Sequence, residues 1–260
     1  MFCLRRLPQQ ARVSRALLHL TLLTSFLFPH VLQADELRIA VASNFAPVLE
    51  QLAADFTAQS GHKLILIAGA TGQHYAQISN GAPFQVLLAA DSERPAKLEA
   101  EGAAVAGSRF TYALGKLVLW SADPALVDTD GDVLASGHFR HLAIANPSLA
   151  PFGLAAKQVF EAKHVRNDVQ HRIVQGENIT QTLQFIHTQN AELGFIAYSQ
   201  WLQLDAGEKG SHWEVPPDLH APIIQQGVIL KDSTAARAFV AFMQNDNSRQ
   251  FIHAQGYDLP

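Results

Sequence analysis

The stretch LRIAVASNFAPVLEQLAADF, residues 37–56, sets the pattern on which the fold is built. Five of its first six residues are apolar, in the manner of a buried strand, and residues 48–56 repeat apolar side chains at helical spacing. Ser43 and Asn44 lie at the junction, where a strand ends and a helix begins. Two small polar side chains without charge at such a junction predict a structural turn or a site for a small ligand.

The same strand–turn–helix pattern continues along the chain. Short apolar runs predict strands at residues 37–42, 64–68, 86–90, 116–120, 142–145, 172–174, 193–197 and 227–230. Amphipathic segments predict helices at residues 48–61, 73–81, 94–102, 154–162, 180–189, 233–245 and 248–256. Alternating strands and helices indicate an α/β fold whose sheets are mainly parallel and covered by helices on both faces.

The chain is long enough for two such α/β lobes. The segments GSRFTYALGKLVLW (107–120) and APIIQQGVILK (221–231) are the places where we expect the chain to cross between them. One lobe then contains residues 35–114 plus 222–260, and the other contains residues 115–221.

Residues 1–34 have the composition of a secretory signal peptide. Four arginines precede an apolar run at residues 16–28, and the small residue Ala34 follows. The alternative is a membrane anchor, but the run is short of the roughly 20 residues that span a bilayer. Cys3, the one cysteine, lies in this segment, so the mature chain would have no disulfide and no thiolate metal site. We therefore expect an exported, periplasmic protein.

Composition excludes some classes of partner and activity. The 260 residues carry a net charge of -4, with no dense basic stripe that would indicate nucleic-acid binding. The mature chain has no G-x-S-x-G motif, no metal triad and no cysteine nucleophile, so we expect no enzyme activity. His138 and His141 form H-x-x-H without a third ligand, which favours a solvated loop.

Four strand-to-helix turns are rich in Ser, Thr, Asn, Gly and Pro. They are VASNFAP (41–47), AGATGQHY (68–75), NPSLAPFGL (146–154) and QGENITQ (175–181), with Glu177 as the one charged residue. Ligands of open parallel sheets collect at the carboxyl ends of strands, and the first turn of a helix has unpaired N–H groups that attract anions. The alternative is that Ser43, Thr71 and Asn178 are ordinary helix N-caps.

Four longer runs carry a resemblance to a known family. They are residues 37–64, 69–91, 142–160 and 176–201, with A-S-N after the opening strand, G-A-P-x-x-x-x-x-A-A-D, and P-x-G-x-A-A-K. Together they resemble the periplasmic molybdate-binding proteins of ABC transporters over the whole mature chain. The resemblance implies a two-lobed periplasmic-binding-protein fold of type II and a receptor for molybdate, and also for tungstate. It implies no cofactor, a membrane permease as partner, and a monomer.

The resemblance also implies which residues contact the oxyanion. The direct contacts to the molybdate oxygens fall on Ser43, Thr71, Phe152 and Ile179. The wider site is Ser43, Asn44, Thr71, Gly72, Phe152, Asn178, Ile179 and Tyr198. Many relatives supply a tyrosine hydroxyl at the positions of Phe152 or Ala197, neither of which has one here. Either the main-chain N–H of Phe152 substitutes for it, or Tyr198 reaches in.

Three further points concern the alternative ligand, Asp91 and His74. A receptor of the same fold for sulfate or another small anion is the alternative function, because the size of the cavity decides between the anions. Asp91 is expected to cap the helix that follows it, since an acid facing a dianion would repel it. His74 follows the Thr71 turn, and we expect it on the surface of its helix.

Overall fold

The computed structural model describes residues 35–260. The predicted signal peptide, Cys3 and the cleavage site near Ala34 lie outside the described residues. Within residues 35–260, no helix is both long enough and apolar enough to cross a membrane.

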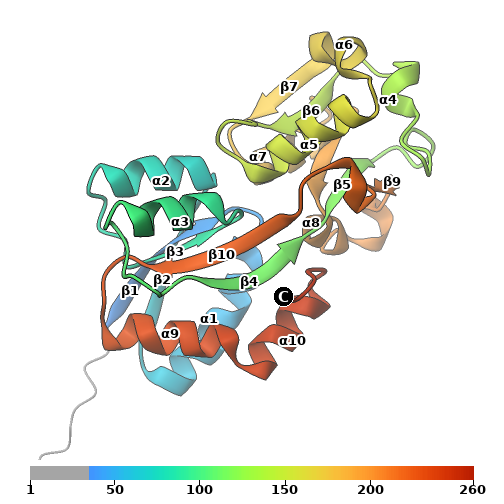
Figure 1. Cartoon of the computed structure of the whole chain (residues 1–260). Helices are drawn as coiled ribbons and strands as arrows, with labels where there is room; N and C mark the ends of the chain where they lie inside the picture. The colour runs from blue at the N-terminus through green and yellow to red at the C-terminus, as the bar shows by residue number, and fades with distance from the viewer. Residues whose placement is uncertain (1–34) are drawn as a thin grey trace, which may run out of the picture. The chain divides into compact units, whose positions relative to one another are not determined.

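The first sheet has five strands in the order β2-β1-β3-β10-β4 (Figure 1). Their bounds are β1 (Glu36–Ala42), β2 (Lys63–Gly69), β3 (Val86–Ala89), β4 (Phe110–Gly115) and β10 (Ile223–Ile229). β1 pairs in parallel with β2 and β3, whereas β10 runs antiparallel to β3 and β4. The parallel strands β1, β2 and β3 therefore end together at one edge of the sheet, where Ser43 follows β1.

Helices cover both faces of the first sheet. One face packs Ile39 and Val41 against α1 (Ala46–Ser60), α9 (Thr234–Gln244) and α10 (Asp246–Ala254). The other packs Ala40 and Leu87 against α2 (Thr71–Ser79) and α3 (Glu93–Ala100). Alternate residues of β1 face opposite layers, as the two-residue period of a strand requires. Gly61 caps the end of α1; its φ of 75° suits glycine, and its N–H donates to the Thr57 carbonyl.

The second sheet has the order β7-β6-β8-β5-β9. Its strands are β5 (Leu117–Ser121), β6 (Leu142–Ala145), β7 (Ile173–Gly176), β8 (Leu193–Ala197) and β9 (Ser211–Glu214). The α-helices of this part are α4 (Val133–Ser136), α5 (Pro151–Ala162), α6 (Arg166–Val169), α7 (Ile179–His187) and α8 (Tyr198–Leu202). Short 3-10 turns occupy Gln170–Arg172, Ala206–Glu208 and Pro217–Leu219. Residues of α5 pack on one face with Leu119 and Phe195, and Ile186 of α7 packs on the other with Val118 and Ile196.

The chain passes between the two sheets twice. Lys116 separates β4 of the first sheet from β5 of the second, and residues 215–222 connect β9 to β10. The strands of the first sheet thus come from residues 36–115 and 223–229, and those of the second from residues 117–214.

The α/β class with two helix-flanked, mainly parallel sheets is confirmed, since four of the five strands in each sheet run in the same direction. Both sheets are mixed, because each contains one reversed strand: β10 in the first and β5 in the second. Each of these strands enters its sheet directly after a crossing from the other sheet. It therefore starts at the edge where the parallel strands end, and runs in the opposite direction.

The sequence pattern did not predict two of the strands, β4 and β9. β4 contains Thr111 and Gly115 and is not a continuous apolar run, and β9 has four residues at the edge of its sheet. α5 begins at Pro151, three residues before the predicted start, because proline is favoured at the first helical position.

Candidate functional site

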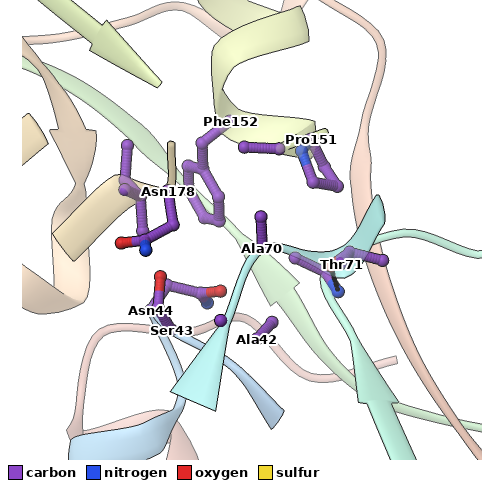
Figure 2. Close-up of a pocket in the computed structure, with 12 residues that line it drawn as sticks. Ala42, Ser43, Asn44, Ala70, Thr71, Pro151, Phe152 and Asn178 are labelled. Atoms are coloured by element: carbon purple, nitrogen blue, oxygen red, sulfur yellow. Dashed lines mark hydrogen bonds between the residues drawn. The ribbon is translucent and has the colours of Figure 1, made fainter. Parts of the chain in front are cut away.

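A small pocket lies where the strand-to-helix turns of the two sheets meet (Figure 2). Its volume is about 200 Å³, including the open space at its mouth. Figure 2 shows Ser43, Asn44 and Thr71 on one side of the pocket and Pro151, Phe152 and Asn178 on the other. The lining residues are Ala42, Ser43, Asn44, Gly69, Ala70, Thr71, Ala90, Ala150, Pro151, Phe152, Asn178 and Ile179. None of them carries a charge.

Five lining residues have main-chain N–H groups that donate to no other group within residues 35–260. They are Asn178, the N-cap of α7, and Asn44, Thr71, Phe152 and Ile179. Thr71, Phe152 and Ile179 lie in the first turns of α2, α5 and α7, and Asn44 comes just before α1. The first N–H groups of a helix have no carbonyl four residues behind them, so they stay available to a ligand. The positive ends of the helix dipoles add to their attraction for an anion.

The hydroxyl groups of Ser43 and Thr71 add two more donors. α1 begins at Ala46 with Phe45 as its N-cap, and α2 begins at Thr71 itself, so neither hydroxyl is a helix cap. The Thr71 hydroxyl oxygen accepts from the Ala90 N–H at 3.0 Å, which leaves its own proton to be donated. Within the part of the chain that the structure describes, the Ser43 hydroxyl has no protein partner.

The asparagine side chains hold the turns. Asn178 caps α7, because its side-chain oxygen accepts from the N–H groups of Thr180 and Gln181, each at 3.0 Å. The N-cap interpretation is therefore confirmed for Asn178. The Asn44 amide donates to Gln225 at 2.9 Å and to the Tyr257 hydroxyl at 3.1 Å. Asn44 and Ile179 thus present main-chain groups to the pocket.

Tyr257 holds the Asn44 turn in place through hydrogen bonds. Its hydroxyl donates to the Asn44 carbonyl at 2.9 Å and accepts from the Ser199 hydroxyl at 2.9 Å. Burial raises the pKa of Tyr257 to about 12, so the phenol stays neutral and keeps its proton for this bond. Ser199 belongs to α8, beside the second sheet, so this bond also joins the two parts of the fold.

Four further hydrogen bonds join elements of the two sheets around the pocket. The Gly72 N–H donates to the Leu149 carbonyl at 2.8 Å, and the Thr180 hydroxyl donates to the Ser43 carbonyl at 3.2 Å. At the rim, Arg94 donates to the Ser148 carbonyl at 2.9 Å, and the Gln73 amide donates to the Glu177 carboxylate at 3.1 Å. These bonds hold the turns of one sheet against the turns of the other.

The charged residues nearest the site are engaged with other groups. The Asp91 carboxylate pairs with the Arg94 guanidinium and accepts from the Arg94 N–H at 3.0 Å, at the start of α3. Burial raises the pKa of the Asp91 carboxyl, and the hydrogen bonds and positive charge of Arg94 oppose that rise. Asp91 thus acts at the beginning of α3, as the sequence predicted.

His74 is buried, so its predicted position on a helix surface is wrong. One ring nitrogen lies 3.1 Å from the Val41 carbonyl and the other 3.3 Å from the Gln77 side-chain oxygen. His74 lies on the inner face of α2, which packs against β1. Burial lowers the pKa of His74 below 6.5, which favours a neutral imidazole at pH 7.

Gly72 and Tyr198 do not line the pocket. The Tyr198 ring stacks on Trp201 with ring centroids 5.5 Å apart, and the Lys116 ammonium lies 5.8 Å from its centre. Of the two substitutes considered for the tyrosine hydroxyl, only the Phe152 N–H therefore lies at the pocket. Gly72 contributes through its bond to Leu149 instead. Within residues 35–260, no group of three or more His, Cys, Asp or Glu side chains is arranged to hold a metal ion.

The lining residues that sequence reasoning missed are small or apolar. They are Ala42, Gly69, Ala70, Ala90, Ala150 and Pro151. They flank the predicted turn residues, and their short side chains let the main chain approach a ligand. The site as a whole offers five N–H and two O–H donors without a formal charge, an arrangement that suits a small, fully ionised oxyanion.

Comparisons with known proteins agree with this chemistry. A family model described as bacterial extracellular solute-binding protein matches residues 37–258. The molybdate-binding protein ModA of Azotobacter vinelandii is 49% identical over 230 residues, which cover 87% of this chain and 91% of that protein. ModA of Rhodobacter capsulatus is 45% identical, with coverages of 86% and 88%. A solved structure of the Azotobacter vinelandii periplasmic molybdate-binding protein superposes with a TM-score of 0.82 at 44% identity, covering 86% of this chain and 99% of that one.

Proposed function

The chain belongs to the family of bacterial extracellular solute-binding proteins, with molybdate-binding proteins among its relatives, and on that basis we propose that it captures molybdate. The proposal extends to tungstate as a second ligand and to delivery of the anion to the membrane permease of an ABC transporter. Family membership also confirms that the chain is a binding protein and not an enzyme.

One observation carries the choice of anion: the pocket presents hydrogen-bond donors and no charged side chain. Molybdate is fully ionised at neutral pH, so it has only acceptors to offer and needs only donors in return. Phosphate carries a proton at neutral pH and gains from an acceptor such as a carboxylate. Sulfate matches the donor pattern as well as molybdate does, so it is the alternative ligand.

The hydrogen bonds that the pocket can form to an anion provide enough free energy for tight binding. Hydrogen bonds to a charged group contribute about 1.5–3 kcal/mol each. Six of them, from the N–H and O–H groups of Ser43, Asn44, Thr71, Phe152 and Ile179, therefore sum to about 10 kcal/mol or more before the costs of desolvation and ordering. Micromolar affinity needs about 8 kcal/mol. Fixed N–H dipoles also avoid burying a cation, whose desolvation costs several kcal/mol.

We propose that the residues named from the family resemblance act in two ways. Ser43, Thr71, Phe152 and Ile179 contact the molybdate oxygens, together with the Asn44 N–H. Gly72 and Asn178 hold the turns that position those donors. Tyr198 stays outside the pocket and makes no contact with the anion.

The binding motion follows from the connections between the sheets. We assign residues 35–114 plus 222–260 to one lobe and residues 115–221 to the other, with hinges near residues 112–118 and 221–228. The hydrogen bonds that join the two sheets around the pocket form when the lobes close on the anion. Closure removes water from the anion, which strengthens each of its hydrogen bonds.

The setting of the protein is also part of the proposal. An extracellular solute-binding protein that feeds a permease works outside the cytoplasmic membrane, here in the periplasm. Export there requires an N-terminal signal, the role proposed for residues 1–34. The chain acts as a monomer, because a single copy supplies every donor of the pocket.

Titration calorimetry of the chain without residues 1–34 tests the function. Molybdate, tungstate, sulfate and phosphate are each titrated into the protein, and molybdate is repeated in excess sulfate. We expect micromolar or tighter binding of molybdate that sulfate does not displace. Tight binding of sulfate alone would establish the alternative, and no heat with any of the four anions would refute an oxyanion receptor.

A further inference from the structure

The hydroxyl of Thr180 links the start of α7, beside the second sheet, to the turn that follows β1 of the first sheet. Thr180 is the second residue of α7, and its main-chain N–H donates to the Asn178 side chain at 3.0 Å. Its hydroxyl donates to the Ser43 carbonyl at 3.2 Å, although 137 residues separate the two in the chain. Thr180 is half-buried and Ser43 is buried. The Asn178 cap thus fixes where α7 begins, and the Thr180 hydroxyl joins that start to the opposite turn.

The Ser43 carbonyl and the Asn44 N–H belong to one peptide group, which is trans. A trans peptide is planar, so its C=O and N–H point in opposite directions and rotate together. The Thr180 hydroxyl holds the C=O end of this group. The other end is the Asn44 N–H, one of the donors that the proposed function places against the anion. A hydrogen bond that orients the carbonyl therefore also orients that donor.

This arrangement distinguishes the Thr180 bond from the three other bonds that join the turns around the pocket. Two of those end on the carbonyls of Ser148 and Leu149, which accept from Arg94 and Gly72. The N–H groups at the other ends of these two peptide groups donate to a carbonyl of their own turn. The third bond joins two side chains. Of the four bonds, the Thr180 bond alone ends on a peptide group that supplies a proposed donor to the anion.

We propose that Thr180 is a positioning residue for the anion: by holding the Ser43 carbonyl, its hydroxyl directs the Asn44 N–H at the ligand and strengthens it as a donor. The inference rests on the proposed function. A hydrogen bond accepted by a carbonyl polarises the peptide group and makes its N–H a better donor. Ile179, the residue before Thr180, supplies its own N–H to the anion under the same proposal. The start of α7 thus contacts the anion directly and also orients a donor of the opposite turn.

The Thr180 bond should act on release of the anion more than on its capture. It joins elements of different sheets, so under the proposed lobe closure it forms as the turns close on the anion. Its loss should leave the association rate nearly unchanged and raise the dissociation rate, as most changes within one interface do. Thr180 therefore serves to retain the anion.

Three substitutions at Thr180 separate the hydroxyl from the rest of the side chain. Thr180→Val keeps the branched shape and removes the O–H, Thr180→Ala removes the O–H and the bulk, and Thr180→Ser retains the O–H. We expect the two variants without the hydroxyl to raise the Kd of molybdate about ten-fold, and Thr180→Ser to stay within about two-fold of the parent. Thr188→Val is the matched control, because the Thr188 hydroxyl lies at the other end of α7 and donates to the Gln184 carbonyl at 2.8 Å. It should bind like the parent.

Two kinds of measurement follow the effect. Calorimetry gives Kd, and a chase of isotopically labelled molybdate with unlabelled molybdate gives the dissociation rate, so the association rate follows from the two. Heteronuclear NMR of the isotope-labelled, molybdate-loaded protein follows the Asn44 amide, whose nitrogen resonance responds to hydrogen bonding at the Ser43 carbonyl. That resonance should shift in Thr180→Val and stay near its parent position in Thr180→Ser. The Thr71 amide, on another turn, should not shift in either variant.

The outcomes separate this inference from the proposed function. A parent protein that binds no molybdate refutes the function and, with it, this role of Thr180. A parent that binds, with equal dissociation rates for Thr180→Val and Thr180→Ala, refutes the role alone. Faster release with an unchanged Asn44 resonance would also contradict it, because the hydroxyl would then act through another group. If Thr180→Val fails to fold, Thr180→Ala against Thr180→Ser gives the same test, since alanine and serine differ by the hydroxyl alone.

Discussion

The main-chain N–H of Gly72 donates to the carbonyl of Leu149 at 2.8 Å, and this bond joins the start of α2 to the turn before α5. A Cβ atom on Gly72 would lie 2.9 Å from the Leu149 Cα and 3.1 Å from its carbonyl oxygen. Both are main-chain atoms that cannot rotate away. Glycine at position 72 therefore permits the close approach of the two turns on which the pocket depends.

Replacing Gly72 by alanine should weaken anion binding. The new methyl group separates the turns, which costs the hydrogen bond to Leu149 and displaces the Phe152 N–H from the pocket. We expect a loss of about 1 kcal/mol or more in binding free energy, roughly five-fold in Kd. Calorimetry with molybdate measures this change.

Gly207→Ala is the matched control, because a Cβ at Gly207 meets no atom within 4 Å. It should bind like the parent. Equal affinity of all three proteins would show that the approach of Gly72 to Leu149 does not matter for binding.

Ser43→Ala should lower affinity without lowering stability. The Ser43 hydroxyl has no protein partner to lose within the described residues, so its removal takes away a donor to the anion alone. The expected loss is about 1–3 kcal/mol in binding free energy. Ser79→Ala removes a hydroxyl that is bonded to the Tyr75 carbonyl on the exposed side of α2 and should leave Kd unchanged. Parent-like affinity of Ser43→Ala would remove Ser43 from the site.

Tyr257→Phe should destabilise the fold. Loss of the hydroxyl leaves the buried Asn44 carbonyl and the Ser199 hydroxyl without this partner. We expect the free energy of unfolding to fall by about 1–3 kcal/mol in urea denaturation. Tyr75→Phe removes an exposed hydroxyl bonded to Glu101 and should change it by less than about 0.5 kcal/mol. Equal midpoints for the two variants would contradict a structural role for the Tyr257 bonds.

His74 should make the protein less stable in acid. Its pKa in the fold is lowered from 6.5 by burial, so below that pH the unfolded chain binds protons that the folded chain does not. The free energy of unfolding is then fully retained above about pH 6.5 and lost as pH falls toward the lowered value. Burial lowers the pKa of His212 as well, which adds to the same slope.

Urea denaturation at pH 7.5 and pH 5.5 tests this effect. The parent should lose more free energy of unfolding between the two pH values than His74→Gln, which has no proton to gain at that position. An equal loss in both proteins would show that His74 does not contribute to the pH dependence.

Much of the fold was visible in the sequence because local patterns decide it. The apolar runs and the turns rich in Ser, Asn and Gly identify the strands that end near the pocket. Parallel strands bring their carboxyl ends together, so the turns at Ser43, Thr71, Phe152 and Ile179 meet at one place in the structure. The edge strand β9 was missed, because its four residues alternate in burial and carry no continuous apolar signal.

The contacts that shape the site depend on residues far apart in the chain. Asn44 bonds to Gln225, 181 residues away, and Thr180 bonds to Ser43 over 137 residues. No local pattern marks such pairs. His74 shows the same limit, because its burial depends on how α2 packs against β1 and not on its own sequence neighbours.

A crystal structure of the chain with bound molybdate tests the central claim most directly. The account predicts a tetrahedral anion with its oxygens in hydrogen-bond distance of the N–H groups of Asn44, Thr71, Phe152 and Ile179 and of the hydroxyls of Ser43 and Thr71. No lysine or arginine nitrogen should contact it. An anion held by Arg94 or another cationic side chain, or bound away from these turns, would contradict the account.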